Sequence, residues 1–294
     1  MSIQFSIVVA TFNRRDTLEE VLPTLLGQTF PAESYEILLC DAGSTDGTQE
    51  LVESLARPNL RFLPGADSGR GGARNRGIRE ARGSIILFTD ADILADPELV
   101  ACHAQAHARH PGDAVVGCEV QVSSFAQYLE FRRNPQAHAR HKSTRRLLPW
   151  HYFLTGNASV SREILLAAGM FDESFTGYGH EDLELGYRLL KQGLKIHYCS
   201  QAVNYHWHPV PFDEQCRKML LAGRSTVRFY RKHKDLTIPL RMGMNPLSLG
   251  LHALLPREGA VMAWLVSLAP RCRLAREIVL QHHYVTGIKE AWRE

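Results

Sequence analysis

The first 122 residues alternate short apolar runs with amphipathic segments, and this alternation restricts the fold more than any other feature of the chain. Continuous apolar runs predict buried strands at 5–10, 36–41 and 84–89, with a shorter strand at 60–63. The segments between them predict helices near 16–27, 47–56 and 73–81, and another from Asp96 onward. Buried strands that alternate with helices are typical of a parallel sheet covered on both faces. The sequence therefore predicts an α/β fold with a mostly parallel, twisted sheet.

Residues 131–150 interrupt this pattern, because they contain many basic residues and no acidic one. We expect a mobile loop there, and long loops of this kind often act as lids. Beyond it we expect helices near 161–168 and 181–192, a strand near 194–199 and a long basic helix near 213–233. The remainder is expected to form two or three helices separated by Pro246, Pro256 and Pro270.

The composition, with 45% hydrophobic and 22% charged residues, is that of a globular protein with a sizeable core. Six scattered cysteines without a C-x-x-C pair argue against a disulfide framework or a zinc site. The chain opens with a strand pattern and has no apolar run of about 20 residues, so we expect neither a signal peptide nor a spanning helix. The expected location is the cytoplasm, including the inner face of its membrane.

The positive charge of the chain is concentrated towards its C-terminal end. From Asp213 onward there are 14 Lys and Arg residues against 7 Asp and Glu, although the net charge of the whole chain is only +3. The helix predicted at 213–233 also carries apolar residues, and the apolar stretches near 247–254 and 261–265 are short. This composition is typical of a peripheral membrane anchor. Packing of the same residues against the rest of the chain, or in a homodimer, explains the composition equally well.

Polar residues follow three of the predicted strands at the point where each strand ends. Thr11 and Asn13 follow the first strand, Asp41 closes the second, and Asp90 and Asp92 follow the strand at 84–89. Carboxyl ends of parallel strands meet at one edge, where ligands of such sheets bind, so these residues predict a polar crevice. Two carboxylates spaced in this way can share a divalent cation, which prefers oxygen ligands. The same D-x-D pattern also occurs in turns and helix caps, and the pattern alone leaves both interpretations open.

Two further segments could bind a ligand, although part of their sequence is explained by local structure. Asp41 could accept hydrogen bonds from a nucleobase or from hydroxyl groups, whereas Ser44 is better explained as a turn residue. Residues 68–77 combine glycines, whose backbone can approach a phosphate, with Arg70 and Arg74, which can pair with one. Their spacing matches neither a dinucleotide-binding fingerprint nor a P-loop.

Groups suited to proton transfer or metal binding lie further along the chain. Glu181 and Asp182 open a predicted helix after a glycine-flanked turn, where acidic residues stabilise the helix dipole. A carboxylate there could also act as a general base. His206 follows the predicted strand, and it could bind a metal ion or a phosphate, or serve only in packing.

Taken in order, these segments resemble the inverting family 2 glycosyltransferases, which have the GT-A fold. The resemblance covers about residues 4–210 and rests on the ordered blocks VVATFNR, LLCDAGSTDGT, GGARNRGI, GSIILFTDAD, TGNASVSREILLAAGMFDESF and GHEDLELGYRL. It implies a catalytic domain at 1–212, with a nucleotide-sugar half at about 1–122 and an acceptor half at about 123–212. Residues 213–294 then form a helical C-terminal extension, in which we find no resemblance.

The resemblance also implies roles for individual residues. The residues expected to bind the donor are Thr11, Asn13, Asp41, Arg70, Arg74 and Asp90. Asp90 and Asp92, with His206, are expected to hold Mg²⁺ or Mn²⁺ at the diphosphate. The pair Glu181-Asp182 resembles the E-D motif that supplies the catalytic base in the family, and we favour Asp182. Family members often have a second aspartate where this chain has Ala42, so no nucleobase is assigned.

The expected function is transfer of a sugar from a nucleoside-diphosphate sugar to a hydroxyl group of a saccharide or lipid-linked acceptor, with inversion and without a nucleic-acid partner. The cation and Arg74 or Arg70 would stabilise the leaving diphosphate, and residues 131–150 would close over the donor. One alternative is a nucleotidyltransferase, which would need a glycine-rich, basic segment after the first strand. The other is a catalytically silent nucleotide-sugar-binding protein of the same fold, against which the retained carboxylates argue.

Overall fold

The computed structural model describes residues 3–66, 69–134, 147–175, 178–207, 210–244, 249–250, 252 and 259–294. The chain divides into two compact units. The first consists of Met1–Thr176 and Glu181–Pro209, and the second of Gly177–His180 and Val210–Glu294. That residues 1–212 form a catalytic domain stays a prediction, because it concerns function.

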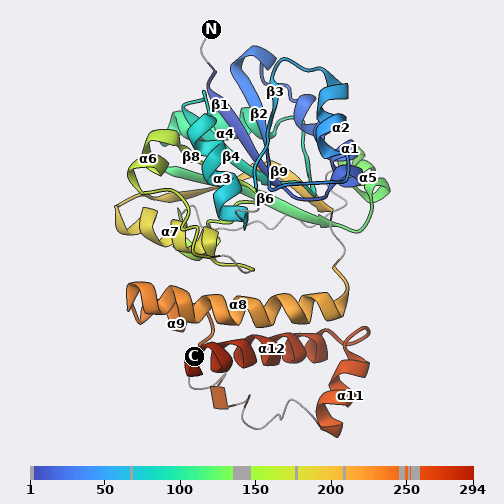
Figure 1. Cartoon of the computed structure of the whole chain (residues 1–294), viewed down its shortest axis with the longest axis vertical. Helices are drawn as coiled ribbons and strands as arrows, with labels where there is room; N and C mark the ends of the chain where they lie inside the picture. The colour runs from blue at the N-terminus through green and yellow to red at the C-terminus, as the bar shows by residue number, and fades with distance from the viewer. Residues whose placement is uncertain are drawn as a thin grey trace. The chain divides into compact units, whose positions relative to one another are not determined.

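A nine-stranded sheet forms the centre of the first unit in the part of the chain that the structure describes (Figure 1). The strand order is β3-β2-β1-β4-β8-β6-β9-β5, with β7 paired to β9. The strands are β1 (Phe5–Thr11), β2 (Tyr35–Asp41), β3 (Leu60–Leu63), β4 (Ile85–Asp90), β5 (Ile93–Ala95), β6 (Ala114–Val122), β7 (Leu147–Leu148), β8 (Ala158–Ser161) and β9 (Ile196–Trp207). The strands β3, β2, β1 and β4 are parallel, as are β6 and β9, whereas β8 is antiparallel to β4 and β6. The predicted α/β fold class is confirmed.

Helices cover both faces of this sheet. They are α1 (Arg15–Leu26), α2 (Thr48–Leu55), α3 (Gly69–Glu80), α4 (Leu99–Arg109), α5 (Phe125–Arg133), α6 (Arg162–Ala167) and α7 (Glu181–Lys191), with 3₁₀ turns η1 (Ala32–Ser34) and η2 (Trp150–Tyr152). In β1, Ile7 packs in one core cluster with Leu22 of α1, whereas the next residue, Val8, packs in another with Ile78 of α3. Successive strand residues point to opposite faces, so a strand that is covered on both sides is apolar at most of its positions.

The loop predicted at 131–150 has wrong boundaries. The helix α5 continues to Arg133, and β7 pairs Leu148 with Ile196 of β9 before the 3₁₀ turn η2. The basic residues at the end of α5 suit a helix C-terminus, which carries a partial negative charge, and they do not indicate a loop. Residues 135–146 lie outside the described part of the chain, and so does most of the predicted lid.

The strand β9 has 12 residues and extends well beyond the strand predicted at 194–199. Its pairing with β6 shifts register after Gly117, so that residues 200–202 form a bulge. A Cβ atom on Gly117 would lie 2.3 Å from the carbonyl oxygen of Ala202, so glycine is needed against the bulge. The prediction that His206 follows a strand was therefore wrong: His206 lies within β9, and the polar bulge hides the continuation of the strand from the sequence pattern.

A buried polar network joins α4 to β8 and β9. His103 places one ring nitrogen 2.7 Å from Ser159 Oγ and the other 2.8 Å from Asn157 Oδ1. His107 lies 2.7 Å from the same Ser159 Oγ, and Asn157 Nδ2 donates to the carbonyl oxygen of Ala202 at 2.9 Å. Burial lowers the pKa of both histidines to about 4, so the network is neutral at pH 7. The Thr-Gly-Asn-Ala-Ser segment thus supplies polar contacts of the core.

The second unit contains α8 (Phe212–His233), α9 (Thr237–Arg241), α11 (Ala260–Leu268) and α12 (Arg273–Arg293). The helices α8 and α12 lie side by side and approach closely (Figure 1). A Cβ atom on Gly223 of α8 would lie 2.0 Å from the carbonyl oxygen of Tyr284, and one on Gly287 of α12 would lie 1.9 Å from that of Leu220. The close approach of the two helices therefore depends on these glycines. The helix predicted at 213–233 and the C-terminal helical appendage are confirmed.

Gly223→Ala is expected to lower the free energy of unfolding by about 1–3 kcal/mol, because the added methyl group overpacks the contact between α8 and α12. The measurement is urea denaturation followed by circular dichroism. Gly250→Ala is the matched control, because no described atom lies within 4 Å of a Cβ atom there. Equal stability of the two variants would contradict the close approach of the helices.

Candidate active site

The carboxyl ends of β1, β2 and β4 bring the predicted strand-end residues to one edge of the sheet. In the ladder of β1 with β2, Thr11 lies opposite Asp41, and in the ladder of β1 with β4, Ala10 lies opposite Asp90. Asp92 follows two residues later, between β4 and β5. The sequence pattern therefore gave the correct placement for these side chains, and their roles in binding stay predictions.

The carboxylate of Asp41 organises the turn after β2. It accepts hydrogen bonds from Gly43 N at 2.9 Å and from Ser44 N at 2.8 Å, and the side chain is buried. Asn13, which has a φ of +49°, holds the same turn: its backbone N donates to Ser44 Oγ at 2.8 Å, and its Oδ1 accepts from Thr45 N at 2.9 Å. Asn tolerates this left-handed backbone better than most residues. Asp41 and Asn13 thus fix the shape of a loop at the sheet edge.

Arg74 is buried between two carboxylates that come from distant parts of the sequence. Its Nη2 lies 2.8 Å from Asp90 Oδ1, and its Nη1 lies 2.9 Å from Glu181 Oε1. The guanidinium also lies over the Phe171 ring, 5.6 Å from its centroid. Burial lowers the pKa of Arg74, but the charges of Asp90, Glu181 and Asp182 outweigh this effect and raise it, so Arg74 stays a cation. This contact joins the end of β4 to the first turn of α7.

Neighbouring residues of α3 hold Arg74 in this position. A Cβ atom on Gly77 would lie 2.6 Å from Val8 Cγ1, so the glycine allows α3 to lie directly on β1. Asn75 Nδ2 donates to the carbonyl oxygen of Phe171 at 2.9 Å, and Phe171 N donates to Asn75 Oδ1 at 2.8 Å. The glycine-rich segment at 69–77 therefore packs as a helix against the sheet. Its role as a backbone cradle for phosphate gains no support from these contacts.

The two arginines predicted to bind the donor have different surroundings. The side chain of Arg74 is 2% exposed and is held by Asp90 and Glu181. Arg70 lies exposed in the first turn of α3. Arg70 is therefore the arginine that a ligand in solution can reach, whereas Arg74 acts on the charge and the position of its carboxylate partners.

Glu181 and Asp182 begin α7 but have different partners. Glu181 is 4% exposed and bound by Arg74, and its Oε2 has no hydrogen-bond partner among the described residues. Asp182 Oδ1 accepts from Leu183 N at 2.8 Å. Burial and the charge of Glu181 raise the pKa of Asp182 to about 7, against the opposing effect of Arg74. A carboxyl group with a pKa near neutrality suits proton transfer at cellular pH.

Asp92 and His206 approach each other where β5 pairs with β9. Trp207 N donates to the carbonyl oxygen of Asp92 at 2.8 Å, and His206 Nε2 lies 3.6 Å from Asp92 Oδ1. On the other side of the ring, His206 Nδ1 lies 3.3 Å from Glu119 Oε1 of β6. Burial lowers the pKa of His206, but Asp92 and Glu119 outweigh this effect and raise it to about 10. The two carboxylates thus favour a positive charge at the imidazole.

These groups fit a divalent cation in the type of atom that they offer. Asp92 supplies an oxygen and His206 a nitrogen, both side chains are partly exposed, and a metal ion could take the place of the imidazole proton. Among the described residues, no three His, Cys, Asp or Glu side chains already lie close enough together to hold an ion. Of the three residues predicted to bind the metal, Asp92 and His206 lie close together, whereas the carboxylate of Asp90 is bound by Arg74.

The sequence interpretation missed two features of this edge. The first concerns Thr11, which was expected to contact the donor. Its Oγ1 is buried without a hydrogen-bond partner among the described residues, which is unusual for a hydroxyl group and was not foreseen. Glu119 was not considered. The indication in the sequence is the alternation along β6, where Glu119 and Gln121 interrupt an apolar run and are exposed.

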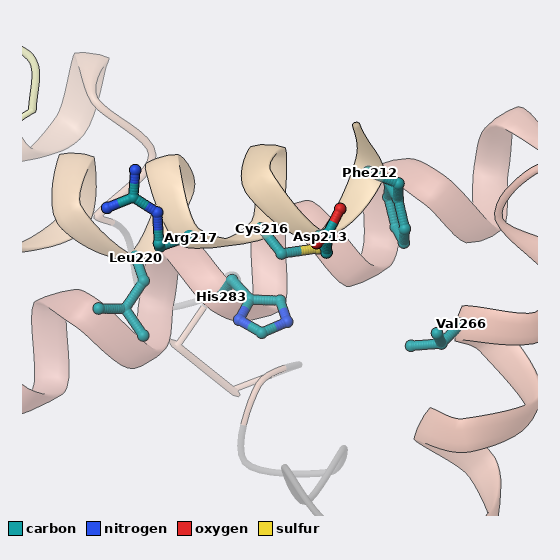
Figure 2. A pocket seen from close by; sticks show the side chains of 7 residues that line it. All are labelled: Phe212, Asp213, Cys216, Arg217, Leu220, Val266 and His283. Atoms are coloured by element: carbon teal, nitrogen blue, oxygen red, sulfur yellow. The ribbon is translucent and has the colours of Figure 1, made fainter. Parts of the chain in front are cut away.

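A cavity of about 420 Å³ lies within the second unit (Figure 2). Its lining residues are Phe212, Asp213, Cys216, Arg217, Leu220, Val266 and His283. Asp213 is the one carboxylate among them, so this cavity lacks the paired carboxylates found at the sheet edge. The sheet edge in the first unit is the candidate active site.

Two family models match the chain. The model for "Glycosyl transferase family 2" matches residues 6–166, and the model for "N-terminal domain of galactosyltransferase" matches residues 135–209. The first match includes the ends of β1, β2 and β4, and the second includes Glu181, Asp182 and His206.

Curated relatives have names of the same kind. Validoxylamine A glucosyltransferase of Streptomyces hygroscopicus subsp. jinggangensis is 31% identical over 79% of this chain and 61% of its own length. The uncharacterised glycosyltransferase YfnE of Bacillus subtilis is 28% identical over 69% of this chain and 65% of its own length. Chondroitin synthase of Escherichia coli is 28% identical over 79% of this chain and 40% of its own length. The chain thus spans less than two thirds of the length of these relatives.

Solved structures share the fold. The mannosyltransferase PcManGT from Pyrobaculum calidifontis, in complex with GDP-Man and Mn²⁺, has a TM-score of 0.67 at 19% identity and covers 99% of this chain and 88% of its own. TarS residues 1–349 of S. aureus has a TM-score of 0.63 at 19% identity, with 99% of this chain and 91% of its own covered. At this identity the likeness shows the fold alone, and the GT-A fold expected from the sequence is confirmed.

Asp182→Asn is expected to stabilise the folded chain at pH 8. The pKa of Asp182 is raised from its ordinary value of 3.8 to about 7, so between these values the folded chain binds more protons than the unfolded chain. Stability therefore falls as the pH rises through this range, and the loss is complete above about pH 7. Because Asn does not titrate, the midpoint of thermal denaturation of the variant should exceed that of the wild type at pH 8, with a smaller difference at pH 5. A variant less stable than the wild type at pH 8 would contradict the raised pKa.

Proposed function

The chain belongs to glycosyl transferase family 2, and we propose that it transfers a sugar from a nucleoside-diphosphate sugar to an acceptor hydroxyl with inversion at the anomeric carbon. The observation that carries this proposal is the contact of Arg74 with Asp90 and Glu181. It holds the end of β4 next to the first turn of α7, where the pKa of Asp182 is raised to about 7. Carboxylates at a strand end and a proton acceptor beside them are the groups that such a displacement needs.

The donor would bind at the carboxyl edge of the parallel strands. Thr11 would contact the nucleoside, because it lies opposite Asp41 at the carboxyl end of β1. Asp41 and Asn13 shape the adjoining loop and would form the wall of this part of the site. The exposed Arg70 would pair with the diphosphate, since guanidinium groups bind phosphate through two hydrogen bonds.

Asp182 would act as the general base. Glu181 has a fixed ion pair with Arg74, and losing its charge would break that pair, whereas no hydrogen bond to Arg74 holds Asp182 among the described contacts. With a pKa of about 7, Asp182 is ionised in much of the population at cellular pH and can accept the proton of the attacking hydroxyl. One displacement without a covalent intermediate inverts the anomeric carbon.

Asp92 and His206 would hold Mg²⁺ or Mn²⁺, while Asp90 stays paired with Arg74. A bound cation would offset the negative charge of the leaving nucleoside diphosphate. The mixed oxygen and nitrogen ligands favour Mn²⁺ over Mg²⁺. The PcManGT structure is a complex with GDP-Man and Mn²⁺, which supports the same assignment.

The substrate class is proposed at the level that the relatives share. Their names include glucosyl transfer and chondroitin synthesis, and the related structures contain GDP-Man, UDP or UDP-GlcNAc. We infer a hexose or N-acetylhexosamine donor and a saccharide or lipid-linked acceptor. Polysaccharide or glycoconjugate synthesis is the corresponding process.

The second unit is proposed to touch the inner face of the cytoplasmic membrane. Val261, Trp264 and Val266 of α11 are exposed, whereas Met262 and Leu265 of the same helix are buried in a small core. Exposed apolar side chains, including a tryptophan, beside a chain end rich in Arg and Lys suit an anionic lipid surface. No helix in the described ranges is long and apolar enough to cross a bilayer.

Asp182→Asn is expected to lower sugar transfer by about 10²–10⁴-fold while donor affinity stays near that of the wild type, because Asn binds in the same way but accepts no proton. The measurement is release of nucleoside diphosphate from UDP-, GDP- and dTDP-sugars with Mn²⁺. Asp92→Ala should instead weaken donor binding in Mn²⁺. A wild type that releases no nucleoside diphosphate from any of these donors, with water or added glycans as acceptor, would contradict the proposed function. Wild-type rates in Asp182→Asn would contradict the assignment of the base.

The wild type is expected to co-sediment with vesicles of phosphatidylglycerol and phosphatidylcholine at low salt, and less at high salt. Trp264→Ser should weaken this binding, whereas Leu190→Ser, which changes an exposed apolar residue of α7 in the first unit, is the control. No binding at low salt, together with a dimer in sedimentation velocity, would contradict the membrane proposal and favour a homodimer through the C-terminal helices.

A further inference from the structure

Glu119 lies on the same face of the sheet as His206. In the parallel ladder of β6 with β9, Gln121 lies opposite His206, and Glu119 lies two residues before Gln121. Residues two apart in a strand point to the same face. Both β6 side chains are exposed, and they are the polar residues of an otherwise apolar strand.

The two nitrogens of the His206 ring face different carboxylates. His206 Nδ1 lies 3.3 Å from Glu119 Oε1, while His206 Nε2 lies 3.6 Å from Asp92 Oδ1. Gln121 Nε2 donates to Glu119 Oε1 at 2.8 Å and lies 3.2 Å from His206 Nδ1, so it holds the carboxylate on the Nδ1 side of the ring. A metal ion that Asp92 and His206 both bind would therefore be bound by Nε2 of the ring. Glu119 would remain on the Nδ1 side, away from the ion.

The backbone leaves room for the Glu119 carboxylate. A Cβ atom on Gly156 would lie 2.6 Å from Glu119 Oε2, so a larger residue at position 156 would displace this oxygen. Gly156 is itself fixed to β9, because its carbonyl oxygen accepts from Asn204 Nδ2 at 2.6 Å. Glu119 thus has an amide donor on one oxygen and a glycine next to the other, and its position is determined by more than one contact.

We propose that Glu119 is a positioning residue, which accepts the Nδ1–H of His206 and thereby directs Nε2 towards Asp92 as a ligand of the divalent cation. The inference rests on the proposed metal site of the transferase. A carboxylate that accepts the second N–H of a ligating histidine fixes the tautomer and the orientation of the ring. Its loss in other metal sites weakens metal binding by about 10–100-fold.

The experiment measures Mn²⁺ binding to the full chain without any donor, by isothermal titration calorimetry at pH 8. Glu119→Gln keeps the size of the side chain but removes its charge, and it should raise the Kd for Mn²⁺ by about 10–100-fold. Glu163→Gln, which removes an exposed carboxylate from α6, is the control and should leave the Kd within about 2-fold of the wild type, as distant surface charges are screened. His206→Ala should lose binding at least as strongly as Glu119→Gln.

A second measurement separates positioning from folding. Electron spin-echo spectra of bound Mn²⁺ should show nitrogen coupling in the wild type and in Glu163→Gln, and weaker coupling in Glu119→Gln at saturating Mn²⁺. The circular dichroism spectrum without metal should be the same in all three proteins, so that a weaker coupling does not come from unfolding. Unchanged nitrogen coupling in Glu119→Gln would overturn the positioning role.

The outcomes distinguish this inference from the function on which it rests. If the wild type binds Mn²⁺ and Glu119→Gln binds it as tightly, Glu119 has no positioning role and the proposed metal site stands. If the wild type binds no Mn²⁺, with or without UDP or GDP, the proposed metal site fails and the role of Glu119 fails with it.

Discussion

A buried guanidinium group between two carboxylates is the contact on which the arrangement of the site depends. Arg74 pairs with Asp90 at the end of β4 and with Glu181 at the start of α7, and almost none of its surface reaches solvent. The pair with Glu181 is buried on both sides, and removal of one partner from such a pair leaves an uncompensated charge, at a cost of about 3–5 kcal/mol. The sheet edge and α7, which are distant in sequence, are therefore held in one geometry. The packing of α3 on β1 through Gly77 is what brings Arg74 to this position.

The same contact gives different surroundings to residues that look equivalent in the sequence. Each of the two acidic pairs has one member bound to Arg74, namely Asp90 and Glu181. The second member of each pair is in different surroundings. Asp92 approaches His206, and Asp182 has a pKa that is raised to about 7. Under the proposed function, Arg74 thus separates structural carboxylates from those that bind the cation or accept the proton. A lysine at position 74 could not form both contacts with one planar group.

The sequence was sufficient to predict the α/β class, the strands at 5–10, 36–41 and 84–89 and their polar ends, because a buried parallel strand is a mostly apolar run that polar residues end. It did not predict β6 or the full length of β9. Their pairing is set by contacts distant in sequence, and the bulge in β9 breaks the apolar run. For the same reason it missed Glu119, because this residue approaches His206 of β9, a strand that is distant in sequence. The basic end of α5 was taken for a loop, since charge alone does not distinguish a helix terminus from a mobile segment.

The most direct measurement of the central claim is anomalous diffraction at the manganese edge from crystals of the full chain grown with Mn²⁺ and a nucleoside diphosphate. The account predicts a peak within coordination distance, roughly 2.0–2.6 Å, of an Asp92 oxygen and of His206 Nε2. Arg74 should still bridge Asp90 and Glu181 in that crystal, and the nucleoside diphosphate should lie along the carboxyl ends of β1, β2 and β4. A manganese peak away from Asp92 and His206, or a nucleotide bound elsewhere on the chain, would contradict the account.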